Sequence, residues 1–556
     1  MKKTFLAIIL LLGFLLRIIA LDKFPVGFTP DEASFGYDAY SILKTGKDQW
    51  GKTLPLVFES FGDYKSPLYA YLTVPSVATF GLNKFSVRLP NAVIGTLAIY
   101  AVYLLVGKLV EKKGAESDLM ATFAALLLAI SPWHIMMSRG AFEANLTTFL
   151  LPLSLYFFFK SFEKPKNLIL SVIFVGLNIF SYHSAKFVTP LVFLAAILIY
   201  RRRLFNNFGI YHKVSIGLVL IFIVLFAFSL KAGSSTRIFD VSIFKTSLLE
   251  ASSERIKAIN EGMNPLLARF VYNKYQAGIR HFVGNYITYF SPQFYFSQGP
   301  GESTYGMVPG RGVLYWFELP LVLLGFMYLL KNISNRSLWI IVVWFLLSPI
   351  PAALSTGPGY AANRAVVALP SIQIICATGL YYLIGKMDSL KYKRTVLAAF
   401  GVSVFMFLGY FMFNYFVLSP QNVAKGMLYG NYEALDYVAK NYNQRSVTVS
   451  RRLSEPHIYV AFINKWDPAD YQENSKLWNY KNLNLGWVDQ MPEYRLGNYL
   501  FKNINYSEYA NENTLLVGRP DEFPASILFD KLFSYPDGEK AVVIVDTINQ
   551  KYAWKN

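Results

Sequence analysis

Two adjacent acids, Asp31 and Glu32, follow Thr29 and Pro30 shortly after a first apolar run. An ionised aspartate, whose reference pKa is about 3.9, can take a proton from an acceptor hydroxyl during a transfer reaction. The same residues also fit a helix start, because Thr29 as N-cap and Glu32 three positions later make a capping box, and acids in a first turn complement the helix dipole. Local sequence leaves both interpretations open.

A second candidate is Lys65, in the run Gly62-Asp63-Tyr64-Lys65-Ser66-Pro67-Leu68 ahead of an apolar, aromatic stretch. A lysine ammonium is a compact point charge suited to a phosphate. A lysine at a membrane interface also simply extends its ammonium to water. Tyr64 beside it is a candidate substrate contact.

A third group lies between Ser138 and Asn145, where Arg139 and Glu143 fall in a tight turn near membrane depth. Ionisable residues there are costly, so they are candidates for a functional site. The alternative is a structural pair at i,i+4 spacing. Lys186, Arg364 and Glu318 occupy comparable positions at the ends of apolar runs.

Metal chemistry is not indicated. No histidine–carboxylate spacing suggests a metal site, and His183 is better explained as a satisfied polar residue. The single cysteine, Cys376, excludes intramolecular disulfides and multi-cysteine metal sites. We therefore expect no cofactor.

The elements that position these residues belong to a membrane protein. Of 556 residues, 54% are hydrophobic and 16% charged, and the mean hydropathy is +0.33. Soluble domains carry about a quarter charged residues. Uncharged runs such as 214–230 and 395–418 are long enough to cross a hydrocarbon core of ~30 Å as helices.

The net charge of +18 lies largely in short basic clusters between the apolar runs. The clusters are Lys108, Lys112 and Lys113; Lys160, Lys164 and Lys166; Arg201, Arg202, Arg203 and Lys213; Lys331 and Arg336; and Lys386, Lys391, Lys393 and Arg394. Placing them all in the cytoplasm gives one consistent topology, as the positive-inside rule requires. The charge is thus explained by orientation, and no nucleic-acid partner is indicated.

We predict an all-α polytopic protein of the cytoplasmic (inner) membrane, with about eleven spans, a retained first span and a cytoplasmic N-terminus. The spans are roughly 4–21, 89–108, 119–137, 141–160, 167–182, 186–200, 214–231, 312–330, 337–353, 365–385 and 395–418. This membrane domain, 1–418, has outer loops at 22–88 and 232–311.

Two outer segments have further signals. In the first loop, a helix from Pro30 should end at Gly46, and its apolar face suggests that it lies along the membrane surface. The segment 419–556 alternates helical and strand patterns, which predicts a small extracytoplasmic α/β domain. Pro536-Asp537-Gly538 within it predicts a hairpin turn.

Together these pieces resemble the lipid-phosphate-dependent membrane glycosyltransferases of the GT-C type, which include the protein O-mannosyltransferases and the lipid A aminoarabinose transferases. The resemblance is carried by the runs Pro30-Asp31-Glu32-Ala33, Lys65-Ser66-Pro67-Leu68-Tyr69, Arg88-Leu89-Pro90, Ser131 to Leu150, and Asn363-Arg364 with Ala368-Leu369-Pro370. It extends to about residue 385. One departure is Ser66, where the family usually has a first proline after the lysine.

The resemblance implies a multi-span fold with a catalytic first outer loop and an inverting transfer from a polyprenyl-phosphate sugar, without an obligatory metal. Asp31 would be the base, with Glu32 beside it. Lys65, helped by Arg364 and Arg139, would hold the donor phosphate. Fixed cations suit a leaving phosphate in a water-poor site.

The acceptor, whether protein, lipid or cell-envelope glycan, is open, and Glu143, Lys186 and Tyr64 are possible substrate contacts. The alternative function is a transporter or flippase of lipid-linked glycans, which would need substrate groups reachable from both sides. A third possibility, a structural assembly protein, would leave these outer-end charges without a role.

Overall fold

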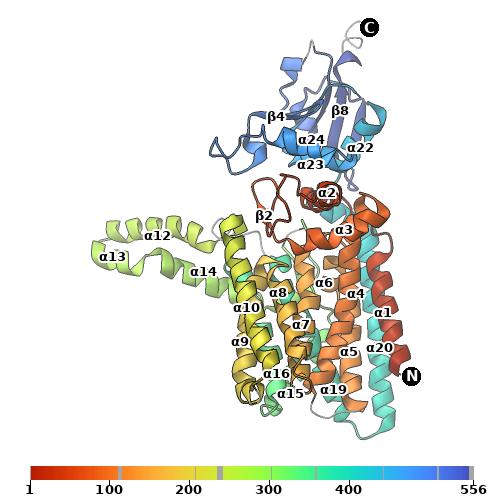
Figure 1. Ribbon diagram of the computed structural model, residues 1–556, viewed down its shortest axis with the longest axis vertical. Helices are drawn as coiled ribbons and strands as arrows, with labels where there is room; N and C mark the ends of the chain where they lie inside the picture. The colour runs from red at the N-terminus through yellow and green to blue at the C-terminus, as the bar shows by residue number, and fades with distance from the viewer. Residues whose placement is uncertain are drawn as a thin grey trace.

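The computed structural model describes residues 2–110, 115–206, 208–234, 242–301, 303–356, 360–442, 444–509 and 512–549. Lys112 and Lys113 of the first basic cluster lie outside these ranges. A long helical bundle stands beneath an α/β domain, and the first loop fills the space between them (Figure 1).

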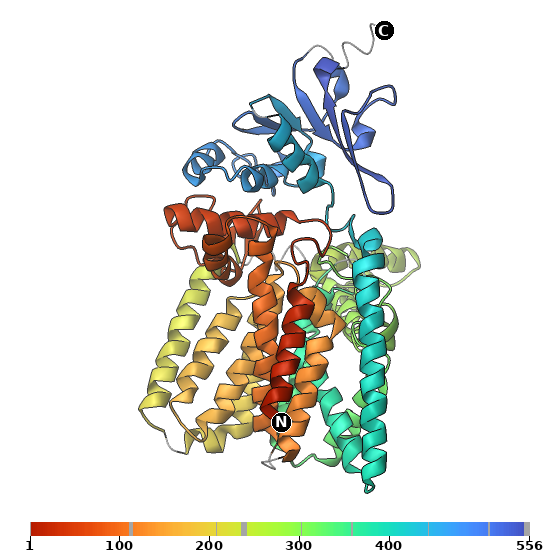
Figure 2. The same cartoon turned by 90° about the vertical axis from the view of Figure 1, so that its right-hand side faces the viewer.

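The bundle is built from helices that run side by side in both views (Figures 1 and 2). The long ones are α1 (Lys2–Ile18), α4 (Lys84–Leu109), α5 (Ala115–Ile130), α7 (Thr147–Ser161), α8 (Asn167–Ile179), α9 (His183–Phe205), α10 (Ile210–Ser229), α15 (Glu318–Lys331), α16 (Arg336–Leu347), α19 (Leu369–Gly385) and α20 (Leu390–Phe413). Short helical segments between them are α6 (Pro132–Met137), η1 (Glu143–Leu146), η2 (Leu230–Ser234), α17 (Ile350–Ala353), α18 (Ala362–Ala365) and η4 (Val366–Ala368), and η5 (Asn414–Leu418) follows α20.

By length and composition, six helices among the described residues could cross a membrane. Shorter apolar helices include Leu68–Phe80, Ser117–Ile130 and Asn167–Ile179. The prediction of a mostly helical polytopic membrane protein is confirmed, and the number of spans stays a prediction.

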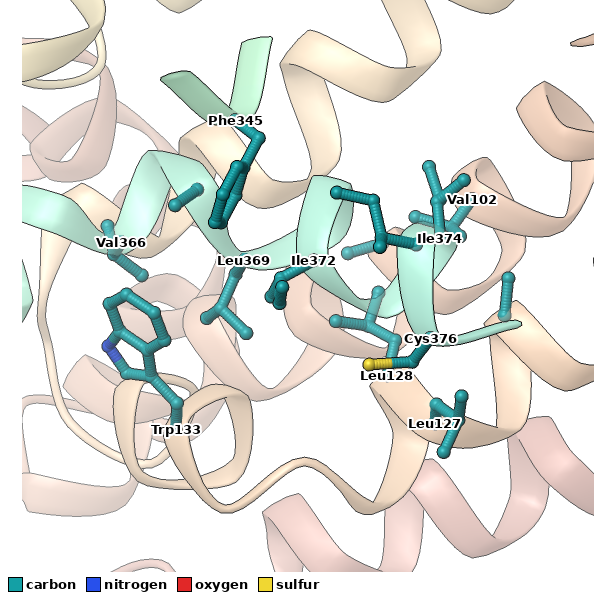
Figure 3. Packing of buried hydrophobic residues seen from close by; sticks show 14 of the residues in the cluster. Val102, Leu127, Leu128, Trp133, Phe345, Val366, Leu369, Ile372, Ile374 and Cys376 are labelled. Carbon is teal, nitrogen blue, oxygen red and sulfur yellow. The ribbon is translucent and has the colours of Figure 1, made fainter. Parts of the chain in front are cut away.

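Helix α19 forms the centre of the bundle. In the buried core its Ile374 and Cys376 lie near Val102 of α4 and Leu127 and Leu128 of α5, and its Leu369 lies on the side of Trp133 of α6 (Figure 3). On its other side Gly379 faces Gly325 of α15, and a Cβ on Gly379 would lie 1.9 Å from the Leu321 carbonyl oxygen. Small residues at this crossing therefore let the two helix backbones approach closely.

The basic clusters gather at one end of the bundle. Lys108, Lys160, Arg202 and Lys331 lie in the last turns of α4, α7, α9 and α15, and Lys386 follows α19. These helix ends lie with the N-terminus, away from the α/β domain (Figure 2).

The first loop contains α2 (Pro30–Thr45), the two-stranded hairpin β1 (Phe58–Glu59) and β2 (Tyr64–Lys65), and α3 (Leu68–Phe80). Helix α2 ends as predicted, because Gly46 adopts a left-handed φ of 72° and its N–H donates to the Ile42 carbonyl. The expectation that α2 lies along the membrane surface stays a prediction, but its apolar face is covered by protein. Most of α2 is buried, and its Gly36 is wedged between Val87 of α4 and Phe462 of the α/β domain.

A helical arm leaves the bundle sideways at the end nearer the α/β domain (Figure 1). It consists of α12 (Ile243–Asn260), α13 (Pro265–Val271) and α14 (Lys274–Thr288), followed by η3 (Gln293–Ser297). Arg280 of α14 pairs with Glu250 and Glu254 of α12 at 2.8 and 2.9 Å, which ties the two long arm helices together.

The segment that follows α20 forms the α/β domain, here called the tail domain (419–549). Its helices are α21 (Ser419–Val423), α22 (Asn431–Asn441), η6 (Arg451–Leu453), α23 (Pro456–Ile463), α24 (Pro468–Ser475), η7 (Val488–Gln490), η8 (Tyr506–Tyr509) and η9 (Pro520–Glu522). Its strands are β3 (Val447–Val449), β4 (Glu493–Leu496), β5 (Tyr499–Lys502), β6 (Leu515–Gly518), β7 (Lys531–Ser534) and β8 (Lys540–Asp546).

The six strands make one sheet in the order β4-β5-β3-β6-β8-β7. Central β3 is parallel to both neighbours, with Val447 opposite Tyr499 and Leu515, and the remaining pairs are antiparallel. The predicted hairpin is present between β7 and β8, where Gly538 has a φ of 90°. Helix α23 lies on the side of this domain that faces α2 (Figure 1).

Candidate active site

The N-terminal capping of α2 determines where the side chains of Asp31 and Glu32 point. Glu32 N–H donates to Thr29 Oγ1 at 3.3 Å, and the Thr29 N–H donates back to Glu32 Oε2 at 3.2 Å. The predicted capping box is therefore present. Because Glu32 turns inward to make it, neighbouring Asp31 turns outward, and its side chain is 49% exposed.

Glu32 is fully buried and bonded on both oxygens. Arg88 donates from Nε to Oε1 at 2.8 Å and from Nη2 to Oε2 at 3.0 Å, and the Ala141 N–H donates to Oε1 at 3.1 Å. Arg88 also donates to the carbonyls of Leu21, Pro25 and Gly27. This network joins the end of α1, α2, α4 and the turn before η1, so Glu32 holds the loop in place rather than facing a substrate.

Asp31 forms an ion pair with Lys65, whose Nζ lies 2.8 Å from Oδ1 and 3.3 Å from the Asp31 carbonyl oxygen. The lysine side chain is only 2% exposed, and its ammonium lies over the rings of Phe35 and Phe61, at 4.7 and 5.3 Å from their centroids. The cation is thus fixed in position by packing and by the carboxylate. Such a preorganised charge needs little rearrangement to stabilise a developing anion.

The Asp31–Lys65 pair opens into a cavity of about 260 Å³ between the bundle and the tail domain. Its lining residues are Thr29, Pro30, Asp31, Phe61, Asp63, Lys65, Ala141, Phe142, Glu143, Thr304, Tyr305, Gly426, Leu428, Ser454, Glu455 and Trp487. Among these, Lys65 is the only cation, beside the acids Asp31, Asp63, Glu143 and Glu455. The cavity therefore offers one fixed anion-binding group and several groups that can bind hydroxyls.

The tail domain closes this cavity and is fastened to the first loop. Tyr459 Oη donates to the Phe28 carbonyl at 2.6 Å, and the Val488 N–H donates to the Phe61 carbonyl at 2.9 Å. Gly62 has a φ of +121°, and a Cβ there would lie 2.0 Å from the Gly486 carbonyl oxygen, so this contact requires glycine.

The interior of the first loop is a separate polar network. Gln49 donates to Asp38 from its backbone N–H at 3.0 Å and from Nε2 at 3.3 Å, and it also donates to Ser34 at 3.1 Å. Burial, together with the charge of Asp48, raises the pKa of Asp38 well above its usual range. These residues stabilise the loop that carries Asp31 and Lys65.

Sequence reasoning missed Glu455, Trp487, Asp63 and Tyr305 as lining residues. Asp63 was within the Lys65 run and could have been selected with it. The others lie far along the chain, in segments without a signature, and only the folding of the tail domain and the second outer loop onto the first loop brings them to the cavity.

The two candidates from the 138–145 turn, Arg139 and Glu143, lie in different surroundings. Glu143 lines the cavity. Arg139 instead points into the bundle, donating to the carbonyls of Leu16 and Ile19 at 2.9 and 2.6 Å, where it satisfies the C-terminal end of α1.

Arg364 and Lys186 line cavities other than that of the Asp31–Lys65 pair, and Tyr64, although it is next to Lys65 on β2, is not among the residues that line the cavity of the pair. Arg364 lines a second cavity, of about 370 Å³, with His281 of the arm, and donates to the Thr356 carbonyl at 2.8 Å. Lys186 lines a small, mostly apolar cavity among α8, α9 and α10. The Tyr64 ring packs against Gly233. The structure therefore brings Asp31, Lys65 and Glu143 together and leaves the other candidates elsewhere.

No group of three or more His, Cys, Asp or Glu side chains suited to a metal ion is found in the part of the chain that the structure describes. The residues at the cavity are suited instead to proton transfer and anion binding.

Residues 64–227 match the model of the dolichyl-phosphate-mannose-protein mannosyltransferase family. No curated protein matches the chain. Among solved structures, ArnT from Cupriavidus metallidurans in the apo state is 12% identical, with a TM-score of 0.50 over 98% of this chain and 97% of that one. The same protein bound to undecaprenyl phosphate is 14% identical, with the same TM-score and the same shares of both chains.

An oligosaccharyltransferase from Archaeoglobus fulgidus is also similar, at 15% identity and a TM-score of 0.49 over 83% of this chain and 63% of that one. At these identities the likeness to ArnT shows a shared fold. The matched segment contains Lys65, Arg88, Arg139 and Glu143. The predicted resemblance to lipid-phosphate-dependent membrane glycosyltransferases is confirmed.

Proposed function

We propose that this membrane glycosyltransferase transfers a sugar from a polyprenyl-phosphate donor to an acceptor, with Asp31 as the base and Lys65 as the ligand of the donor phosphate. The observation that carries the proposal is the Asp31–Lys65 pair, fixed at 2.8 Å on the wall of a cavity between bundle and tail domain. We further propose that the transfer inverts the anomeric carbon.

The chemistry follows from the two groups. The half-exposed Asp31 carboxylate accepts the proton of the acceptor hydroxyl while the oxygen of that hydroxyl forms a bond to the anomeric carbon of the donor sugar. The bond from that carbon to the phosphate oxygen breaks, and the electron pair leaves with the lipid phosphate. Lys65, held against the rings of Phe35 and Phe61, stabilises the negative charge that grows on that phosphate.

The comparisons support the class of donor. The matched family is described as using dolichyl-phosphate-mannose, and one of the ArnT structures contains undecaprenyl phosphate. Both are polyprenyl monophosphates with or without a sugar. A donor whose tail stays in the bilayer also accounts for a cavity at the end of an apolar helical bundle.

The proposal is tested by transfer in vitro. The purified protein in proteoliposomes would be given a panel of polyprenyl-phosphate sugars and membranes of its own host, followed by mass spectrometry of whatever acquires a sugar. We expect one donor to support transfer and a nucleotide sugar to support none. Transfer from the nucleotide sugar, or none from any lipid donor, would refute the proposal.

Lys65→Met is expected to weaken the binding of a sugar-free polyprenyl phosphate by roughly 10- to 150-fold, because a charged hydrogen bond to phosphate is worth about 1.5–3 kcal/mol. Binding would be measured directly in detergent by a fluorescence or calorimetric titration. Exposed Lys47→Met in the same loop is the matched control. Arg364→Met should change the affinity little, since Arg364 lies in the second cavity.

An unchanged affinity in Lys65→Met would exclude the lysine as phosphate ligand. A loss confined to Arg364→Met would move the phosphate site to the second cavity and remove Asp31 from the reaction.

We propose that the cavity and the tail domain lie outside the cytoplasm. The support is the gathering of basic helix ends at the opposite end of the bundle (Figure 2). The protein's single cysteine, Cys376, is fully buried, so a new surface cysteine can be labelled selectively.

Cysteines placed at exposed Lys47 and Asn513 are expected to react with a membrane-impermeant maleimide in cells whose outer barrier alone is permeabilised. A cysteine at exposed Lys391, in the last basic cluster, should react only after lysis. The reverse pattern would invert the orientation.

A further inference from the structure

We propose that Glu455 of the tail domain contacts the sugar of the donor, so that the tail domain forms part of the donor site and helps to select the sugar. This inference rests on the proposed function of the cavity. It assigns a substrate-facing role to a domain that the sequence signature does not reach.

Glu455 lies in the wall of the candidate active-site cavity. Ser454, Glu455 and Trp487 line the same cavity of about 260 Å³ as Asp31 and Lys65. The sugar of the donor is bonded directly to the phosphate that Lys65 would hold. A hydrogen-bonding group elsewhere on the wall of so small a cavity is therefore within reach of the sugar rather than of the lipid tail.

The backbone at this position is strained in a way that fixes the side chain. Ser454 and Glu455 have φ values of 56° and 47°, two consecutive non-glycine residues in the left-handed region. Such conformations persist only where their surroundings enforce them, and they cluster at ligand sites. Here they end η6 and lead directly into α23, which packs against α2.

The surroundings that enforce this conformation centre on Asp489. The Glu455 N–H donates to Asp489 Oδ2 at 2.6 Å, the Tyr494 hydroxyl donates to Asp489 Oδ1, and Arg451 donates to the Asp489 carbonyl at 2.6 Å. The Ser454 hydroxyl donates to the Glu455 carboxylate. Glu455 is thus held from its backbone and from one carboxylate oxygen, as a residue that positions a ligand must be.

The chemistry of the side chain suits a sugar hydroxyl. Burial, followed by the neighbouring charge of Asp489, raises the pKa of Glu455 to about 7. Near neutral pH the carboxyl therefore exists in both forms and can accept or donate a hydrogen bond. When ionised, the Glu455 carboxylate would repel the donor phosphate. Glu455 is therefore better matched to the hydroxyl groups of the donor sugar. The half-exposed Trp487 indole adds an apolar face beside it.

The test compares two ligands that differ only in the sugar. Affinities for a sugar-free polyprenyl phosphate and for the polyprenyl-phosphate sugar that supports transfer would be measured for the wild type, Glu455→Ala and Glu455→Gln. Glu493→Ala, an exposed acid on β4 of the same domain, is the control. A melting curve for each variant establishes folding, and Glu455→Gln keeps the shape of the side chain if Glu455→Ala does not fold.

We expect Glu455→Ala to lower the affinity for the sugar-bearing donor by about tenfold or more and to change the affinity for the sugar-free carrier less than twofold. Glu455→Gln should lower the affinity for the sugar-bearing donor less and should change the preference among donor sugars. Equal losses for both ligands, or none, would overturn this inference and leave the proposed function standing. An increase only in the acceptor KM would assign Glu455 to the acceptor instead. Failure of the wild type to bind or use any lipid-phosphate sugar would overturn both.

Discussion

Replacing Asp31 with asparagine is expected to lower the rate of sugar transfer by about 10²–10⁴-fold at saturating donor, because the amide cannot accept the proton of the acceptor hydroxyl. The substitution keeps the shape of the side chain and an oxygen that can accept from Lys65. Donor affinity should therefore change little. The measurement is single-turnover transfer in detergent or proteoliposomes, beside a melting curve.

Asp31→Asn should lower the stability only moderately. Asp31 takes no part in the capping box, and the asparagine oxygen can still accept from Lys65. Because Lys65 is only 2% exposed and loses its anionic partner, the cost should be about 1–3 kcal/mol. Asp22→Asn, an exposed aspartate earlier in the same loop, is the matched control and should transfer at the normal rate. Near-normal turnover in Asp31→Asn would exclude it as the base and favour the transporter alternative.

Breaking the buried pair of Glu32 and Arg88 is expected to have the largest effect on stability. Both side chains are fully buried and bonded to each other at 2.8 and 3.0 Å. Glu32→Gln or Arg88→Met leaves a buried charge without its partner, which should lower the free energy of unfolding by about 3–5 kcal/mol. The double variant should lose less than the sum of the two single losses.

Unfolding of the four proteins by denaturant in detergent measures this cycle. The control is Glu163→Gln, which disrupts the 2.9 Å pair with Lys108 at the other end of the bundle. That pair is partly exposed, so the loss should be about 1 kcal/mol or less. Additive losses at Glu32 and Arg88 would show that the two residues act independently.

The local elements were predictable from the sequence because their signals are local. The capping box at Thr29 and Glu32, the stop at Gly46 and the turn at Gly538 each depend on a few neighbouring residues, and each is present. The apolar runs likewise overlap the bundle helices, although runs such as 119–137 and 312–330 extend beyond or across the helix ends. Asp31 and Lys65 were selected separately, and the structure places them 2.8 Å apart.

The features of the site that could not be predicted from the sequence are those that depend on contacts between distant segments. Glu32 was considered as a cap or a second acid, but its main partner is Arg88, 56 positions away. Helix α2 has the composition of a surface helix, yet the tail domain covers it. Glu455 lies in a domain without a signature, and only the docking of that domain brings it to the cavity.

The charged residues that were selected for their predicted depth in the membrane have different roles, because their partners also come from distant segments. Depth shows that a charge must be satisfied, but not by which partner. Arg139 satisfies the carbonyls at the end of α1, and Arg364 lies in another cavity, whereas Glu143 reaches the candidate site.

The fate of the sugar–phosphate bond tests the central claim most directly. A polyprenyl-phosphate sugar labelled differently in lipid and sugar would be incubated in proteoliposomes with the wild type and host membranes, and the lipid products separated by chromatography. A glycosyltransferase must release free polyprenyl monophosphate in the same amount as the sugar transferred, and Asp31→Asn must release almost none. Intact donor that has only moved from one leaflet to the other would contradict the account and identify a flippase.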